Sequence, residues 1–281
     1  MDPSAFGIAG VQMPVSATED NIPRMAAYLR HIRNRFPWVR MVLFSELCVK
    51  GPSRALAEEL PGPAEATLCD MARETGLWLI PGSLFERRPE GIFNTTPVIA
   101  PDGTVIARFR KLFPFRPYER EVEAGTEFVV FDVPEVGRFG VSICYDMWFP
   151  ETTRTLAAMG AEVILHPTLT DTVDRDVELA IARASAATNQ VYFFDINGVG
   201  DGGVGRSVIV DPSGHVLHQA AAGPEIMPFE VDLVRLRRER ERGMLTLGQP
   251  LKSFRDRACD FAVYREASGY LDSLGPLALP R

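Results

Sequence analysis

Short apolar runs alternate with amphipathic stretches along most of the 281-residue chain. Runs rich in β-branched and aromatic side chains are typical of buried strands, whereas apolar residues spaced three and four apart indicate helices. Between the first three strands of the N-terminal half, helices are predicted at residues 19–36 and 54–76. The strands predicted in that half are residues 6–12, 41–45, 78–85, 98–100 and 105–109. This alternation predicts a mixed α/β fold.

The second half of the chain repeats the same order of elements. Its helices are predicted at residues 151–159 and 174–188, and both halves end in a hairpin whose turn carries Asp, Pro and Gly. The strands predicted in this half are residues 139–144, 162–166, 191–197, 207–210 and 215–218. We therefore predict a four-layer αββα sandwich with an internal pseudo-two-fold βαβα-ββ repeat, the two sheets packing face to face and the helices lying outside.

Two predicted helices differ in what they should bury. In the helix at 174–188, acidic residues occupy the first turn, as is favourable at a helix N-terminus. The apolar residues expected to form its buried face are Val177, Ala180, Ile181 and Ala184. Residues 235–242, RLRRERER, alternate in charge and predict a solvated helical face instead.

Charge and cysteine usage narrow the functional classes. The chain has 30 Lys and Arg against 37 Asp and Glu, a net charge of −7, which argues against a nucleic-acid partner. No apolar run approaches the roughly 18 residues of a membrane span, and the N-terminus lacks the basic start of a signal peptide. The four cysteines form no CxxC pair, so neither a metal site nor a disulfide framework is indicated, and a cytoplasmic location is expected.

Three segments carry side chains suited to chemistry. Glu46 ends an apolar strand, Lys111 follows the strand at 105–109, and Cys144 ends a buried strand just before a helix start. Ligands of α/β sheets collect at the carboxyl ends of strands. Taken singly, each residue has an ordinary structural explanation: an inert buried thiol, a capping carboxylate, a surface amine. Together they supply complementary catalytic roles, which favours one shared site.

These segments resemble those of the nitrilase, or carbon–nitrogen hydrolase, superfamily, in its amidase-like branch. The resemblance runs from Gly10 to about Asp256 and implies an αββα sandwich. It also implies hydrolysis of a non-peptide C–N bond in a small amide through a cysteine thioester, with release of ammonia and a carboxylic acid and without a metal or cofactor. Further segments similar to the family are Arg183-Ala184, Asn189, Gly205-Arg-Ser207 and Asp211-Pro-Ser-Gly214.

The resemblance also implies a role for each site residue. Glu46 would be the general base, Lys111 the electrostatic stabiliser and Cys144 the nucleophile, and the backbone N–H of Tyr145 would face the oxyanion. The segment from Arg110 onward is similar to the amidase pattern in which a second glutamate follows the lysine, and we assign that role to Glu119 over Glu121 and Glu123. The residues expected to wall the substrate pocket are Leu47, Phe115, Trp148 and His166.

Several alternatives remain open at this level. Tyr145-Asp146 follows Cys144 where nitrilases usually have Trp-Glu, which favours amides or N-carbamoyl amines and amino acids over nitriles. A small aliphatic amide is preferred, because no arginine is evident for a substrate carboxylate. The rivals are a papain-like pair of Cys144 with His166, acyl transfer to another amine, and a non-catalytic binding or regulatory protein of the same fold.

The chain itself predicts the number of domains, and the family resemblance predicts the assembly. No linker separates the halves, so residues 1–258 are predicted to form a single domain. The resemblance implies a homodimer or larger homo-oligomer. Residues 259–281 form an apolar tail without helical or strand periodicity, expected either to pack on a partner subunit or to be a disordered end.

Overall fold

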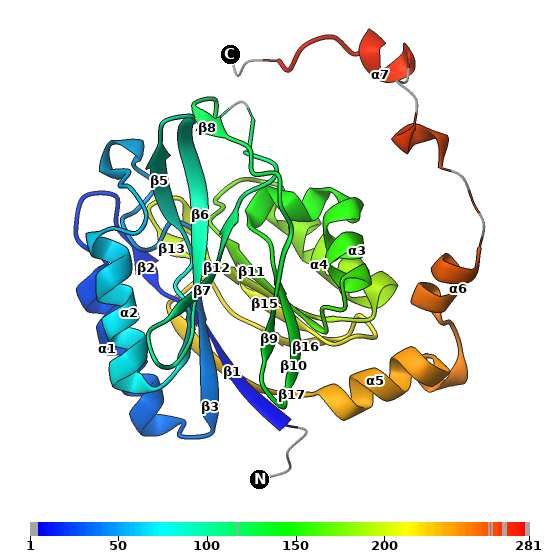
Figure 1. Ribbon diagram of the computed structural model, residues 1–281, viewed down its shortest axis with the longest axis horizontal. Coiled ribbons are helices and arrows are strands. Elements are labelled where there is room, and N and C mark those ends of the chain that lie inside the picture. The colour runs from blue at the N-terminus through cyan, green and yellow to red at the C-terminus, as the bar shows by residue number, and fades with distance from the viewer. Residues whose placement is uncertain (1–4, 117, 258, 260, 266–268, 279–281) are drawn as a thin grey trace.

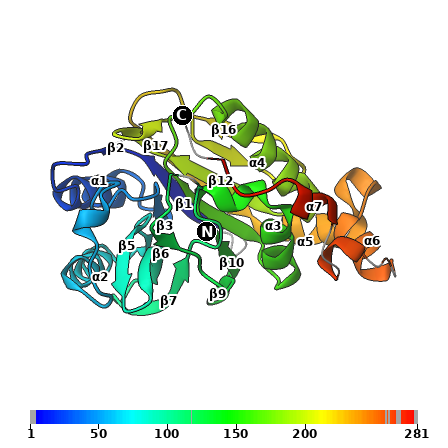
Figure 2. The same cartoon turned by 90° about the horizontal axis from the view of Figure 1, so that it is seen from above.

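Two β-sheets face each other, and helices cover the outer face of each (Figure 1, Figure 2). The computed structural model describes residues 5–116, 118–257, 259, 261–265 and 269–278. Viewed from above, helices α1 (Ile22–Arg35) and α2 (Pro63–Thr75) lie on one side, and α3 (Pro150–Ala158) and α4 (Arg175–Asn189) on the other. The four layers confirm the predicted αββα sandwich.

The first sheet has the strand order β17-β1-β3-β4-β6-β5, with β7 and β8 also paired to β6. Strands β1, β3 and β4 are parallel, joined by the crossover helices α1 and α2. The strands of this sheet are β1 (Ala5–Gln12), β3 (Val39–Phe44), β4 (Trp78–Ile80), β5 (Leu84–Arg88), β6 (Gly91–Ile99), β7 (Val105–Arg110), β8 (Val122–Glu123) and β17 (Glu225–Asp232).

The second sheet has the order β16-β15-β12-β11-β10-β9, in which β10, β11 and β12 are parallel. Its strands are β9 (Val129–Val133), β10 (Gly137–Val141), β11 (Val163–Thr168), β12 (Tyr192–Asn197), β15 (Val208–Val210) and β16 (Val216–Gln219). A small third sheet contains β2 (Pro14–Val15), β13 (Val199–Gly200) and β14 (Gly203–Val204).

The internal repeat is visible in the pairing. Each half has three parallel strands linked by two helices, then an antiparallel hairpin, β6–β7 in one half and β15–β16 in the other. Each half also contributes one strand to the sheet of the other half. Strand β9 follows the first half in sequence but pairs with β10, and β17 follows the second half but pairs with β1. This exchange ties the two halves into one body.

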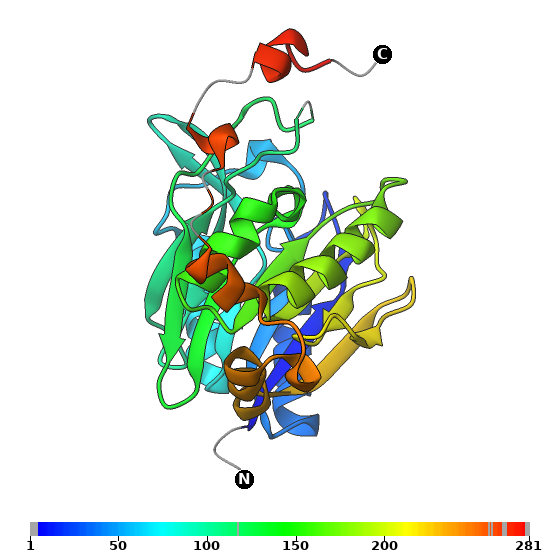
Figure 3. The same cartoon turned by 90° about the vertical axis from the view of Figure 1, so that its right-hand side faces the viewer.

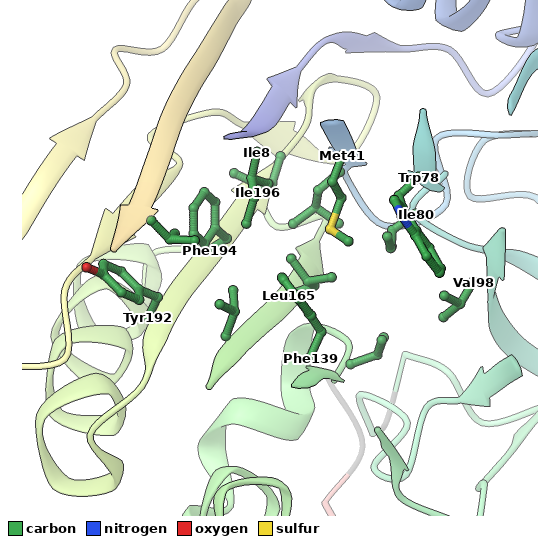
Figure 4. Close-up of a cluster of buried hydrophobic side chains, with 14 of the residues drawn as sticks. Ile8, Met41, Trp78, Ile80, Val98, Phe139, Leu165, Tyr192, Phe194 and Ile196 are labelled. Atoms are coloured by element: carbon green, nitrogen blue, oxygen red, sulfur yellow. The ribbon is translucent and has the colours of Figure 1, made fainter. Parts of the chain in front are cut away.

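The space between the sheets is filled by side chains from both inner faces. Figure 4 shows Ile8, Met41 and Trp78 from the first sheet opposite Leu165 and Phe194 from the second. Separate apolar clusters join each sheet to its helices. Burial of this many large apolar side chains is the main stabilising contribution to the fold, and it fixes the strand ends that carry the polar site residues.

Three predicted elements of the first half are wrong in extent, and the first is the strand predicted at 98–100, which is the end of the longer β6 (Gly91–Ile99). The segment predicted as one strand at 78–85 is broken by Pro81 and Gly82 into β4 and β5, because proline donates no ladder hydrogen bond and Gly82 has a φ of +76°. The helix predicted at 54–76 begins only at Pro63 and is preceded by a single 3₁₀ turn, Arg54–Leu56. The sequence Leu60-Pro-Gly-Pro63 interrupts it, since proline is tolerated only in the first turn of a helix.

The predicted buried face of α4 is also wrong. Val177, Ala180 and Ala184 are exposed and Ile181 is half-buried, whereas Arg175 and Glu178 are buried beside Leu179, Ala182 and Ala186. The helix is rotated so that two charged residues of its first turn face inward. These charges pair with each other and with a strand residue, and this pairing makes their burial tolerable.

The C-terminal helices lie outside the sandwich, as the view in Figure 3 makes clear. The alternating charges of residues 235–242 fall on α5 (Leu233–Arg242), followed by α6 (Pro250–Asp256) and α7 (Gly269–Ser273). The Tyr264 hydroxyl donates a hydrogen bond to Glu151 of α3 in the same chain, at 2.7 Å. Parts of the predicted tail, residues 260, 266–268 and 279–281, lie outside the described residues. Across the described ranges, no helix is long and apolar enough to cross a membrane.

Candidate active site

Glu46 and Cys144 lie just beyond the carboxyl ends of two strands that belong to opposite sheets of the sandwich, β3 and β10. Cys144 begins a 3₁₀ turn, Cys144–Trp148, with a φ of +46°, and Leu47, directly after Glu46, has a φ of +51°. Left-handed backbone is uncommon for residues other than glycine and is often retained where a site requires it. In both places a sharp change of chain direction follows the polar residue.

Lys111 lies between two carboxylates. It follows β7, and its Nζ donates to Glu46 Oε1 at 2.9 Å and to Glu119 Oε2 at 2.8 Å. Both lysine and Glu46 are almost fully buried. The structure therefore brings together Glu46, Lys111, Glu119 and Cys144, residues from four separate segments of the chain.

Two further groups fix the position of Glu46. Asn94 of β6 donates through Nδ2 to Glu46 Oε1 at 2.7 Å and lies 3.4 Å from Glu119 Oε1. The backbone N–H of Leu169, just after β11, donates to Glu46 Oε2 at 3.0 Å. Both oxygens of Glu46 are thereby held, one by the first sheet and one by the second.

Burial and neighbouring charges shift the pKa values of the residues in this cluster. Burial raises the pKa of Glu46 despite the opposing charge of Lys111, and a side-chain hydrogen bond links Glu46 to Cys144. Burial and the Glu46 charge raise the pKa of the Cys144 thiol well above its ordinary value. Burial disfavours the Lys111 charge, but the charges around it, led by Glu46, outweigh this and raise its pKa. The cysteine at rest is therefore a protonated thiol beside a carboxylate able to accept its proton.

The Asp146 carboxyl stabilises the turn that carries Cys144 through two hydrogen bonds. Its Oδ2 accepts from the Ile143 N–H at 2.9 Å and its Oδ1 from the Phe113 N–H at 2.8 Å. Burial raises the pKa of Asp146 to about 7. Since Phe113 lies two residues after Lys111, this carboxyl joins the cysteine turn to the lysine loop.

A cavity of about 490 Å³ opens over the cluster, enough for a small organic molecule. Of the four side chains predicted to wall it, Leu47 and Phe115 do so, and Tyr145 is also in its lining. Trp148 and His166 are not part of this lining. Further residues in it are Pro52, Tyr118, Leu169, Thr170, Asp171, Thr172, Glu178 and Gly202.

His166 lies in the packed interior around the second sheet, and Trp148 is half-buried against the apolar cluster on the outer side of that sheet. His166 is fully buried on β11, with Nδ1 2.7 Å from Ser142 Oγ and its ring against Phe193. Burial lowers the pKa of His166 to about 4, so the ring is neutral at pH 7. Trp148 packs among apolar residues at the base of α3 and α4. An imidazole with so low a pKa is a weak base for the Cys144 thiol, which disfavours the Cys144–His166 alternative.

The sequence interpretation missed Asn94, Asp146, Tyr118 and Glu178. Asn94 lies outside the strand predicted at 98–100, and only the observed length of β6 places it in a buried strand, where its amide needs a partner. Asp146 follows Tyr145 and Tyr118 precedes Glu119 in sequence, and both Tyr145 and Glu119 were assigned to the site. The contacts that bring Asp146 and Tyr118 to the site come from other segments of the chain, which the sequence does not show. Glu178 gave no signal, because a carboxylate in the first turn of a helix is ordinarily a solvated one.

Comparison with known proteins adds an independent line of evidence. The family model described as carbon–nitrogen hydrolase matches residues 7–241. The ω-amidase NIT2 of Homo sapiens is 28% identical over 260 residues, which cover 85% of this chain and 93% of the relative. The ω-amidase NIT2-A of Xenopus laevis is 32% identical over 201 residues, covering 66% of this chain and 72% of that protein.

Solved structures agree in fold. Nit3 of Saccharomyces cerevisiae, described as a member of branch 10 of the nitrilase superfamily, superposes with a TM-score of 0.79 at 26% identity and covers 88% of this chain and 97% of its own. An amidase from Nesterenkonia sp., solved as a cysteine-to-alanine mutant in complex with butyramide, has a TM-score of 0.74 at 23% identity, covering 86% and 96% of the two chains. At that identity the second likeness concerns the fold alone.

Proposed function

This chain belongs to the carbon–nitrogen hydrolase family and acts on amide C–N bonds, and on that premise we propose that it hydrolyses small linear amides through a thioester on Cys144. The observation that carries the proposal is the buried cluster at the base of the 490 Å³ cavity, where Glu46, Lys111 and Glu119 surround the thiol. A nucleophile, a base held by fixed donors and a cation are the parts that acyl transfer needs.

In the first half of the reaction, Cys144 Sγ bonds to the amide carbonyl carbon while the thiol proton passes to Glu46. The carbonyl oxygen becomes an oxyanion, stabilised by the Lys111 charge and the backbone N–H of Tyr145. Glu46 then returns its proton to the amide nitrogen, the C–N bond breaks, and ammonia leaves. The acyl group remains on sulfur as a thioester.

In the second half, a water molecule gives a proton to Glu46 and bonds to the thioester carbon. The C–S bond breaks, the carboxylic acid is released, and the proton on Glu46 returns to the Cys144 sulfur. Glu119 accepts a second hydrogen bond from Lys111, so that the ammonium keeps its position when Glu46 becomes neutral. In this proposal each carboxylate has a separate task, proton transfer for Glu46 and orientation for Glu119.

The test is ammonia release from a panel of formamide, acetamide, longer aliphatic amides, ω-amides and N-carbamoyl amines under identical conditions. We expect turnover of the short aliphatic amides above that of N-carbamoyl compounds. A preference for N-carbamoyl amines would show that the substrates are N-carbamoyl compounds and not small aliphatic amides. Absence of ammonia from every member would contradict the enzyme assignment and favour a binding or regulatory protein.

We also propose that residues 1–258 act as one domain, in the cytoplasm, and that the chain assembles as a homodimer or larger homo-oligomer. Two observations support assembly: the exposed apolar side chains of the tail, among them Val263, Leu271 and Leu274, and the exposed Val177 on α4. Sedimentation analysis should give a mass of at least two chains. A monomer at micromolar concentration would contradict the proposed assembly.

A further inference from the structure

The cavity over Cys144 has a wall whose charge is predominantly negative. Besides Glu46 and Glu119, which are paired with Lys111, the lining contains Glu178 and Asp171. Lys111 is the one cation among the described lining residues, and both of its carboxylate partners are already in place. A bound molecule that carried an anionic group would therefore meet uncompensated negative charge away from the reacting centre.

Glu178 is held toward the cavity by a buried ion network. It lies in the first turn of α4 and is 3% exposed, and its Oε2 accepts from Arg175 Nη1 at 3.0 Å. The same Nη1 lies 2.9 Å from Asp195 Oδ2 on β12, and Nη2 donates to the backbone carbonyl of Arg206. One guanidinium thus serves two carboxylates, so the network of Arg175, Glu178 and Asp195 carries one net negative charge when both acids are ionised.

The Glu178 charge acts on the reacting end of the cavity. It is among the charges that raise the pKa of the Cys144 thiol, so the two residues are electrostatically coupled. Burial, together with the Asp195 charge, raises the pKa of Glu178 itself to about 7, and at pH 8 the carboxyl is mostly ionised. In a partly buried site such a charge is weakly screened and acts at several ångströms.

Arg116, which follows the lining residue Phe115 in sequence, offers no compensation. In sequence, Arg116 lies between the lining residues Phe115 and Tyr118. Its guanidinium, however, donates to the backbone carbonyls of Glu119, at 2.6 Å, and Val122, at 2.9 Å. On the α4 side, Arg206 pairs with Asp176 at 2.6 Å. Both of these cations are engaged outside the described lining of the cavity.

We infer that Glu178, with Asp171, selects amides whose far end is cationic or neutral and rejects amides whose far end is a carboxylate. This deepens the proposed amidase function and rests on it. The physical basis is that a substrate ammonium would gain a charge-assisted contact in the cavity, whereas a substrate carboxylate would be desolvated beside a like charge.

Three amides of matched chain length test this at pH 8: pentanamide, 4-aminobutanamide, whose far end is an ammonium, and the monoamide of glutaric acid, whose far end is a carboxylate. The rate of ammonia release gives kcat/KM for each, and the value for each charged amide is divided by that for pentanamide. We expect the ammonium amide to exceed the carboxylate amide by at least about tenfold, given the Coulomb energy of one charge pair at this range.

Glu178→Gln separates electrostatic selection from packing, since glutamine keeps an oxygen for Arg175 but removes the charge. Relative to pentanamide, the ammonium amide should become worse and the carboxylate amide better, so that their ratio falls by about tenfold. A purely structural disturbance would lower all three values together. Asp176→Asn is the matched control: it removes a carboxylate from the same helical turn, but one that is exposed and faces Arg206, and the ratio should not change.

Asp171→Asn provides a second variant at an exposed position, where folding is not in question, and should change the ratio in the same direction by a smaller factor. Equal or better use of the carboxylate amide by the unmodified enzyme would overturn the inference while leaving the amidase function standing. An unchanged ratio in both Glu178→Gln and Asp171→Asn would overturn it as well. Ammonia from none of the three amides would instead contradict the proposed function itself, and the inference with it.

Discussion

Replacing Cys144 with alanine should abolish amide hydrolysis while leaving the fold intact. Loss of the atom that bonds to the substrate removes the whole covalent route, so the rate of ammonia release should fall by at least about 10⁵-fold. Alanine keeps the Cβ, so the backbone at φ +46° is under no more strain than before, and the free energy of unfolding should change by only about 1 kcal/mol. Urea denaturation and ammonia release, measured on the same preparation, check both parts.

Cys48→Ala is the matched control for this substitution. Cys48 is also a fully buried thiol, but its Sγ faces the Pro81 carbonyl and it is not part of the cavity lining. Its variant should lose similar stability and keep its activity within about threefold. Adding Glu46→Gln to Cys144→Ala should cost little further activity, because the residues act as a unit. Substantial residual turnover in Cys144→Ala would remove the cysteine from the mechanism.

Replacing Lys111 with methionine should reduce both activity and stability. The oxyanion loses its cation, which should lower kcat by about 10³-fold or more. Glu46 and Glu119 are left buried without their shared partner, and breaking a buried ion pair in this way costs about 3–5 kcal/mol. The surface lysine Lys252, whose Nζ donates to the Glu241 carbonyl, gives a matched Lys→Met control expected to be nearly neutral.

The stability loss in Lys111→Met should depend on pH. In the unmodified protein Lys111 overcomes the effect of burial and holds the pKa of Glu119 below its ordinary value, which contributes stability at neutral pH that is lost on acidification. Without the lysine, burial raises the pKa of both carboxyls. The penalty is then largest at pH 8 and shrinks toward pH 5 as they bind protons. Unfolding curves at these two pH values measure the difference, and a deficit that is equal at both would contradict the charge-based explanation.

The sandwich and the reactive residues could be predicted for the same physical reason. Buried parallel strands give continuous apolar runs, and Glu46 and Cys144 follow two such runs at the strand ends where a site forms, whereas Lys111 follows the antiparallel hairpin strand β7. The family resemblance distinguished Glu119 from Glu121 and Glu123, and the structure brings Glu119, not the other two, to Lys111.

The parts that could not be predicted depend on contacts between distant segments. The buried face of α4 was misassigned because an apolar pattern counts Val177 as inside and Glu178 as outside, whereas pairing with Arg175 and Asp195 reverses this. The family resemblance placed Trp148 and His166 on the cavity wall, where the structure does not put them. Side chains alternate across a strand, and His166 points into the packed interior beside Ser142 and Phe193.

The central claim is that the reaction passes through an acyl group on Cys144, and partition with hydroxylamine tests it most directly. With pentanamide as substrate, the account predicts that added hydroxylamine diverts the thioester, so that the hydroxamate rises at the expense of pentanoic acid. The two products together should equal the ammonia released, and Cys144→Ala should form neither. Ammonia released with pentanoic acid as the sole acyl product, at any hydroxylamine concentration, would contradict the covalent route.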